Sequence, residues 1–414
     1  MRNILFLLVD CLRADAVSGE QRGTVTPAID RLMAGGTYFD QAISVASTTT
    51  TCVGSLLTGN YPFSHGIRTL YGYKLNGGCV TLPQVLQTHG YHTYALVTGP
   101  LSPLTGLNRG FEEYDCRTEE VYLSEEWGEN FRRKLREKAF QEPWFIFLHL
   151  WEIHKPRKIL ERFDTRRFGV DPYERAVSSL DPELGRLLDL VGDDTTVILH
   201  GDHGENREVV RQSLRYRFYD RVKRRLGYPV EPRRYKIGHT FHVYDFLLRV
   251  PLLFYGPGIF PAGKVVPDQV CQIDVFPTLV EGLGLDMPSQ IHGRSLVPLM
   301  KGDSLPEVPA HVAAVGERFK DSKNWFVGMR AGGWKYAFAP RDSGIPEELS
   351  HLETDPNEWR NLAKKNPAVR DKLRQQLLDI IAGTYYVTDD TDGEEMSETD
   401  KKVMEERLKQ LGYL

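Results

Sequence analysis

Short apolar runs alternate with helix signals along the chain up to about residue 300. Five such runs predict buried strands, at residues 4–9, 93–98, 144–150, 195–200 and 250–255. Between the first two, Thr26-Pro27 is typical of a helix start, and Gly35-Gly36 is typical of a helix end. This alternation predicts an α/β fold, with a large, mostly parallel sheet that helices cover on both faces.

The pattern changes after about residue 300. Shorter runs predict strands at residues 312–315, 325–330 and 334–338, followed by a helix at about 367–382. We expect a large unit at residues 1–300 and a smaller second unit at 301–414. Within the smaller unit, the acidic stretch 389–400 is expected to be a solvated linker, and 401–411 a final helix.

Composition points to a soluble globular protein. The 414 residues exceed what one hydrophobic core usually serves, 41% of them are hydrophobic, and the net charge of -4 says little about partners. The five cysteines are scattered without close pairs, which favours a reducing compartment over a disulfide framework. The apolar run before Asp10 is too short to span a membrane and lacks a cleavage site. We expect a cytoplasmic protein.

Two strand ends carry residues that bind metals. Asp10 follows the first apolar run, and Asp202-His203 follows the run at 195–200. Open parallel sheets place their active sites at such strand ends. A carboxylate beside an imidazole suits zinc or manganese better than calcium, although magnesium and calcium stay possible. Each residue could instead be a structural helix cap, and for Asp10 that alternative is the stronger one on position alone.

Thr49 stands at the expected start of a helix, in the stretch 47–59. An alcohol is a weak nucleophile until a base or a metal activates it. A threonine here could also be an ordinary helix cap. The same helix end would hold a phosphate or sulfate, since its backbone N–H groups and its dipole favour anions. Thr49 therefore gains a catalytic meaning only together with the metal ligands.

Two further stretches complete a possible anion pocket. His154 and Lys155 follow the run at 144–150, and His239 precedes the run at 250–255. Donors of this kind can stabilise negative charge as an ester bond breaks. His149 and His242 lie on apolar runs instead, so we expect them to be core residues.

A basic insertion spans residues 205–238. Its segment 207–225 carries eight basic side chains against two acidic ones, and apolar residues recur there every fourth position, which predicts a helix beside the pocket. It is either a solvated helix packed on its own domain, or a guide for a polyanionic, lipid or glycan-phosphate substrate that could also touch anionic surfaces.

A series of short motifs occurs in a fixed order. They are residues 8–15 (LVDCLRAD), 55–62 (SLLTGNYP) with His65-Gly66, 201–205 (GDHGE), 248–252 (LRVPL) with 256–258, 273–279 (IDVFPTL), 293–299 (GRSLVPL), and 355–358 (DPNE) with 361–363. In order and spacing they resemble the sulfatase branch of the alkaline phosphatase superfamily. The resemblance covers nearly the full chain and implies an α/β/α sandwich with a small C-terminal α+β subdomain built on an antiparallel sheet.

The chain departs from this family at the nucleophile. Family sulfatases carry a cysteine, converted to formylglycine, six residues before the serine that matches Ser55, and that place is Thr49. Cys52 is out of register, so we expect no formylglycine. A threonine there resembles the nucleotide pyrophosphatase/phosphodiesterases, the phosphoethanolamine transferases and the lipoteichoic acid synthases, in which it attacks phosphorus.

The resemblance also implies roles for the other residues. Asp10, Thr49, Asp202 and His203 would hold one divalent metal ion, and His154 and His239 would contact the substrate or leaving group. Members with two metals carry an aspartate four residues before the histidine that matches His154, where this chain has Leu150, and Cys11 replaces the second aspartate of the usual pair. We therefore expect a single metal.

The leading hypothesis is a metal-dependent hydrolase or transferase that acts on phosphate mono- or diesters through a covalent Thr49 intermediate. One alternative is a sulfate-ester hydrolase that lacks formylglycine, and another is a non-catalytic protein that uses the pocket to bind an anion. The expected partner is a small-molecule, lipid or glycan ester rather than a nucleic acid, and the oligomeric state is open.

Overall fold

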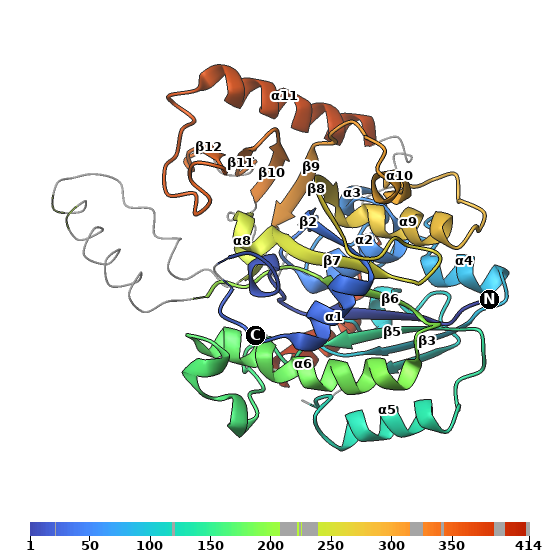
Figure 1. Cartoon of the computed structure of the whole chain (residues 1–414). Coiled ribbons are helices and arrows are strands. Elements are labelled where there is room, and N and C mark those ends of the chain that lie inside the picture. Colours follow the sequence, from blue (N-terminus) through green and yellow to red (C-terminus); the bar gives the residue numbers. More distant parts are fainter. Residues whose placement is uncertain are drawn as a thin grey trace.

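An eight-stranded sheet forms the centre of the computed structural model, which describes residues 1–20, 22–117, 121–207, 222, 225, 239–314, 326–340, 343–384 and 394–410 (Figure 1). The strand order is β4-β3-β5-β1-β6-β7-β2-β8. Neighbouring strands run parallel except at β7, which is antiparallel to both β6 and β2. The expected mostly parallel sheet is confirmed.

The five expected strands of the sheet are present. They are β1 (Ile4–Val9), β3 (His92–Val97), β5 (Trp144–Leu150), β6 (Thr196–Gly201) and β7 (Arg249–Tyr255). Three more strands were not predicted from the sequence pattern: β2 (Thr37–Ile43), β4 (Glu113–Cys116) and β8 (Lys264–Cys271). β4 and β8 lie at the sheet edges and are partly exposed, so they carry charged residues and lack a continuous apolar run.

Helices cover both faces of this sheet, as Figure 1 shows. The α-helices of the large domain are α1 (Pro27–Gly35), α2 (Thr49–Thr58), α3 (Pro62–His65), α4 (Leu82–Thr88), α5 (Glu126–Arg136), α6 (Pro172–Val191), α8 (Asp245–Leu248), α9 (Val275–Gly282) and α10 (Val297–Lys301). No helix of the described chain is both long enough and apolar enough to cross a bilayer.

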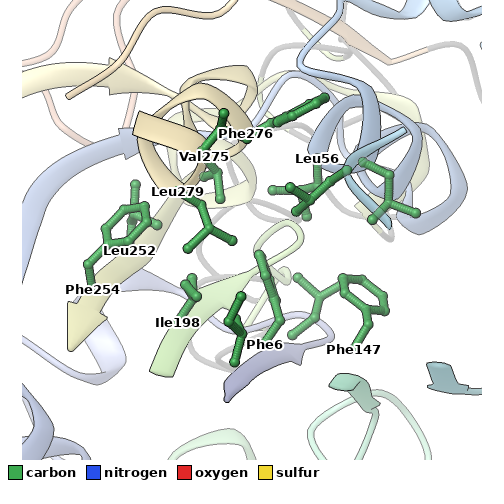
Figure 2. Packing of buried hydrophobic residues seen from close by; sticks show 14 of the residues in the cluster. Phe6, Leu56, Phe147, Ile198, Leu252, Phe254, Val275, Phe276 and Leu279 are labelled. Carbon is green, nitrogen blue, oxygen red and sulfur yellow. The ribbon is translucent and has the colours of Figure 1, made fainter. Parts of the chain in front are cut away.

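Strand β1 is buried on both sides. Alternate residues Ile4, Phe6 and Leu8 belong to one apolar cluster, and Leu5, Leu7 and Val9 belong to another. In the first cluster the sheet packs against α2 and α9, where Leu279 lies over Ile198 and Leu56 points toward the sheet (Figure 2). The second includes residues of α1, α5 and α6. A strand covered on both faces must be apolar throughout, which explains the unbroken run at 4–9.

A smaller antiparallel sheet follows, in the order β12-β11-β10-β9. Its strands are β9 (Ala310–Ala314), β10 (Phe326–Ala331), β11 (Trp334–Phe338) and β12 (Glu348–His351), and α11 (Pro367–Thr384) packs on one face (Figure 1). The backbone N–H of Ala313 in β9 donates to the carbonyl of Val45 at 2.9 Å. The small sheet therefore supports the segment that leads into Thr49.

The last helix, α12 (Glu398–Gln410), packs on the large domain, although the sequence pattern grouped it with the second unit. Met404 and Leu408 are fully buried against Leu70 and Tyr71. Arg407 also donates to the carbonyl of Arg117 at 2.6 Å. The expected acidic linker ends in ordered contacts, since Met396 is buried in the same cluster, while residues 385–393 lie outside the described chain.

Burial of Met404 predicts how firmly α12 is held. Met404→Ala should make α12 detach more easily by about 2 kcal/mol or more, because truncating a buried methionine leaves a cavity. Amide hydrogen exchange within α12 should then accelerate roughly 30-fold. Val403→Ala is the matched control, since Val403 is 51% exposed on the same helix. Equal acceleration in both variants would contradict this packing.

Buried His65 predicts a pH dependence of stability. Burial lowers the pKa of His65 from 6.5 to about 3. Between pH 3 and pH 6.5, His65 is therefore protonated in the unfolded chain and neutral in the folded protein. The free energy of unfolding should fall as the pH drops from 6.5 toward 3. His65→Gln should reduce that slope by up to about 1.4 kcal/mol per pH unit in denaturant titrations. His89→Gln, at a partly exposed site, should leave the slope much less changed.

Candidate metal and nucleophile site

Three neighbouring strands bring metal-binding side chains to one edge of the sheet. β1 runs parallel to β5 and β6, and Val9 is in register with Leu150 on one side and Gly201 on the other. Asp10, His149 and Asp202 therefore lie at the carboxyl ends of adjacent strands. One oxygen of each carboxylate and one nitrogen of His149 lie within 4.8 Å of one another.

Asp202 is oriented by the backbone around it. Its Oδ1 accepts hydrogen bonds from the N–H groups of Cys11 (3.0 Å) and His203 (2.7 Å). Its Oδ2 is buried and accepts no hydrogen bond from the described residues. Oδ1 is thus held by the backbone, and Oδ2 could coordinate a cation.

Thr49 lies against His203. Its Oγ1 is 3.2 Å from His203 Nε2, and that nitrogen is 3.4 Å from Asp202 Oδ2 and 3.9 Å from Asp10 Oδ1. His203 Nδ1 lies 2.9 Å from the carbonyl of Gly204, which favours a proton on Nδ1 and leaves the Nε2 lone pair facing Thr49. The structure thus brings together the four residues expected to hold the metal.

Hydrogen bonds hold the segment before α2 against the candidate metal-binding loop at Asp202. Ser44 Oγ donates to the carbonyl of Asp202 at 2.6 Å, and Gln272 Nε2 donates to the same carbonyl at 2.9 Å. Thr48 precedes Thr49 in an extended conformation, and Thr49 is the first helical residue. The first turn of a helix has backbone N–H groups without intrahelical acceptors, so an anion can bind there.

The donor set fits a divalent cation. Asp10 and Asp202 are both fully buried, and two carboxylates in one dry site repel each other unless a cation or a proton neutralises them. Two carboxylates, a hydroxyl and an imidazole nitrogen are suitable ligands for zinc or manganese.

His149 also belongs to this site, which corrects our expectation of a simple core residue. It is fully buried as expected, but its Nε2 lies 3.7 Å from Asp10 Oδ2. Burial, only partly offset by the charge of Asp202, lowers the pKa of His149 to about 4. The ring is therefore neutral at neutral pH and has a lone pair. Its sequence surroundings are apolar, so only the neighbouring strand reveals this position.

A second group of ligands lies beside the first. Cys11 Sγ is 4.0 Å from Nδ1 of both His203 and His239. Ligand atoms of Cys11, His154 and His239 all lie within 4.8 Å of one another. Burial and the neighbouring His239 lower the pKa of His154 well below 6.5. Burial also raises the pKa of the Cys11 thiol, and the carboxylates of Asp10, Glu205 and Asp202 add to this.

Glu205, for which we expected no role from sequence, connects this group to basic residues. Its Oε2 lies 3.7 Å from His239 Nδ1 and 3.9 Å from Arg157, and its Oε1 lies 3.9 Å from Lys155. Burial opposes ionisation of Glu205, but His239, Lys155 and Arg157 outweigh it and lower its pKa to about 2. Sequence position could have pointed to both residues, because Glu205 lies two residues after His203 and Arg157 lies two residues after Lys155.

Two other residues lie away from these ligands. His242 stacks on Tyr244 with ring centres 3.6 Å apart, and it faces Glu348 of the small sheet at 3.3 Å. The sulfur of Cys52 is 3.2 Å from Ser44 Oγ and 3.3 Å from the carbonyl of Ala46. Burial raises the pKa of Cys52, so its thiol is a poor nucleophile.

Most of the basic insertion lies outside the described residues, namely 208–221, 223–224 and 226–238. Arg207, the first basic residue of its predicted helix, is described. Its guanidinium pairs with Asp171 at 2.8 Å and with Glu174 at 2.5 Å, at the start of α6. Arg207 is thus engaged within the domain. The guide expected from residues 207–225 stays a prediction for the other basic side chains.

Comparison with curated proteins finds arylsulfatases. Human arylsulfatase K is 30% identical over 149 residues, which is 34% of this chain and 27% of that protein. Arylsulfatase K of Xenopus laevis is 28% identical over 221 residues, which is 50% of this chain and 36% of that protein. The matched segments therefore span only about a quarter to a third of these relatives.

Solved structures share the fold. The phosphonate monoester hydrolase of Agrobacterium radiobacter superimposes with a TM-score of 0.72 at 17% identity, over 93% of this chain and 96% of that one. A protein of glycosaminoglycan metabolism from Bacteroides thetaiotaomicron gives a TM-score of 0.72 at 18% identity, over 98% and 99% of the two chains. At such identities the likeness concerns the fold.

Family models match the sequence directly. A model of the C-terminal region of N-sulphoglucosamine sulphohydrolase matches residues 240–383. The sulfatase model matches residues 2–285, which is well over half of the chain and includes both groups of ligands. The chain belongs to the sulfatase family, in the sulfatase branch of the alkaline phosphatase superfamily.

Proposed function

We propose that this protein is a metal-dependent ester hydrolase that cleaves phosphate mono- or diesters by attack of Thr49. The observation that carries the proposal is the position of Thr49 Oγ1, 3.2 Å from His203 Nε2 at the start of α2. Asp10, Thr49, Asp202 and His203 would hold the cation. It would lower the pKa of the threonine hydroxyl and neutralise charge on the ester oxygens.

The chain's own groups prepare the attack. The backbone N–H groups at the start of α2 orient the ester beside Thr49. Lys155 and His239, which lie 3.9 Å and 3.7 Å from Glu205, would donate to the non-bridging oxygens. His154 is held neutral by burial, so it offers one N–H to the leaving group. Water then releases the group from Thr49, and transfer to an alcohol instead of water would make the enzyme a transferase.

The nucleophile favours phosphate over sulfate. Threonine matches the phosphorus-attacking members of the superfamily, whereas the sulfatases that it otherwise resembles use formylglycine. Sulfate-ester hydrolysis is the second candidate, because the curated relatives are arylsulfatases. A panel of nitrophenyl phosphate, bis-nitrophenyl phosphate, a phenyl phosphonate ester and nitrophenyl sulfate, each with zinc, manganese, magnesium or calcium, decides between them. If no ester is turned over, the result would favour the third hypothesis, a non-catalytic protein that binds an anion.

Removal of the hydroxyl tests the nucleophile. Thr49→Ala should lower kcat by at least about 1,000-fold, because no other atom can form the covalent intermediate. Thr49→Ser should keep activity within about tenfold of wild type. Thr51→Ala is the matched control on the same helix turn, since Thr51 bonds to Thr48 and not to His203. Full activity in Thr49→Ala would refute the threonine mechanism.

Replacement of one carboxylate tests the cation. Asp202→Asn keeps the Oδ1 acceptor for the two backbone N–H groups but loses the charge of the ligand oxygen. Metal content by elemental analysis should fall by one equivalent per chain, and turnover should fall with it. Asp30→Asn, at a partly exposed carboxylate on α1 that pairs with Arg22, is the control. Unchanged metal content in Asp202→Asn would refute this ligand set.

A further inference from the structure

A second cluster of possible ligands lies beside the proposed cation site, and neither Asp10 nor Asp202 belongs to it. It consists of Cys11, His154 and His239, with Glu205 at its edge. We propose that this cluster binds a second, soft divalent cation such as zinc, with the Cys11 thiolate as a ligand. This goes beyond the proposed function, and the number of bound ions tests it without reference to turnover.

The distances suit a zinc ion. Cys11 Sγ lies 4.0 Å from His239 Nδ1, and the three ligand atoms lie within 4.8 Å of one another. In a tetrahedral zinc site, bonds of about 2.3 Å to sulfur and 2.1 Å to nitrogen separate the two ligand atoms by roughly 3.6 Å. Shortening these separations by rotation of the side chains would close the site.

Glu205 supplies a fourth donor. Its Oε2 lies 4.0 Å from Cys11 Sγ and 3.7 Å from His239 Nδ1. Lys155 and Arg157 stand 3.9 Å from this carboxylate, and their charges oppose a cation. The Lys155 side chain is 51% exposed, so solvent screens its charge, and the carboxylate together with a thiolate balances the charge of a divalent ion.

The backbone fixes Cys11 in place. Its φ of 63° is unusual for a residue other than glycine. Two hydrogen bonds hold it there, from its own N–H to Asp202 Oδ1 (3.0 Å) and from the Tyr173 hydroxyl to its carbonyl (2.8 Å). The sulfur is thereby held toward His239 in a fully buried position. Such a conformation persists only when the surroundings impose it.

His203 separates the two cation sites. Its Nε2 faces Thr49 and Asp202, while Cys11 Sγ approaches its Nδ1 at 4.0 Å. The first site is rich in oxygen donors, and the second offers sulfur and nitrogen donors, which prefer softer ions. When the cation binds to the second site, a metal–sulfur bond forms and the thiol proton leaves to solvent.

Cobalt substitution tests the second site. Chelator-treated wild type should take up two cobalt ions per chain and show a thiolate-to-cobalt charge-transfer band. Cys11→Ser should bind one ion and show no band. Cys52→Ala, which removes another fully buried cysteine, should bind two ions and keep the band. His239→Gln should also bind one ion, which covers the case in which Cys11→Ser fails to fold.

Asp202→Asn separates this proposal from the first site. It should bind one ion and keep the band, because the asparagine Oδ1 can still accept the hydrogen bond from the Cys11 N–H. A wild type that binds one ion without a band would overturn the proposal. So would a band that disappears in Asp202→Asn, since Cys11 would then be a ligand of the first ion. Failure of the Thr49 mechanism would change turnover and leave these ion counts intact.

Discussion

Buried negative charge at one edge of the sheet is the constraint on which the site depends. Asp10 and Asp202 have no exposed surface, and they stand at the ends of strands that are apolar on both faces. An unpaired buried carboxylate costs several kcal/mol even after the protein relaxes. Backbone N–H groups stabilise one oxygen of Asp202 but do not neutralise its charge. A bound cation would neutralise both carboxylates and complete the proposed site.

The rest of the fold positions Thr49, the proposed nucleophile, against this charge. The segment that leads into α2 is tied to the candidate metal-binding loop, because Ser44 and Gln272 both donate to the carbonyl of Asp202. On the other side, the small sheet pairs with the same segment through Ala313 and Val45. Thr49 is thus held between the two sheets. A displacement of about 1 Å there would cost much of the catalytic advantage of a positioned nucleophile.

The sequence predicted the buried centre of the fold well and its edges poorly. β1, β5 and β6 are buried on both faces, so each appears in the sequence as a continuous apolar run. β4 and β8 lie at the edges with partly exposed residues, and no apolar run marks them. The position of α12 was missed because two buried residues, Met404 and Leu408, attach it to the large domain across a long sequence separation.

In the candidate site, too, some residues could be predicted from the sequence and others could not. Thr49 was predicted by counting back from Ser55, and Asp10, Asp202 and His203 were predicted from their places after strands; the structure brings the four together. His149 was read as a core residue, because burial alone does not tell a ligand from a packed imidazole. What distinguishes it is Asp10 on the neighbouring strand, 3.7 Å away, which no local pattern contains. Glu205 and Arg157 likewise gain meaning only from their distance to His239 and Lys155.

The charge of the pocket connects the two proposals to the substrate. A divalent ion in the first site cancels Asp10 and Asp202. A second ion would cancel the Cys11 thiolate and Glu205, which leaves Lys155 and Arg157 to face the ester with two positive charges. Without the second ion, Cys11 stays a neutral thiol and Glu205 cancels one of these cations. Because the charges of a ligand and its pocket are best matched, the two-ion form would suit a dianionic monoester and the one-ion form a monoanionic diester.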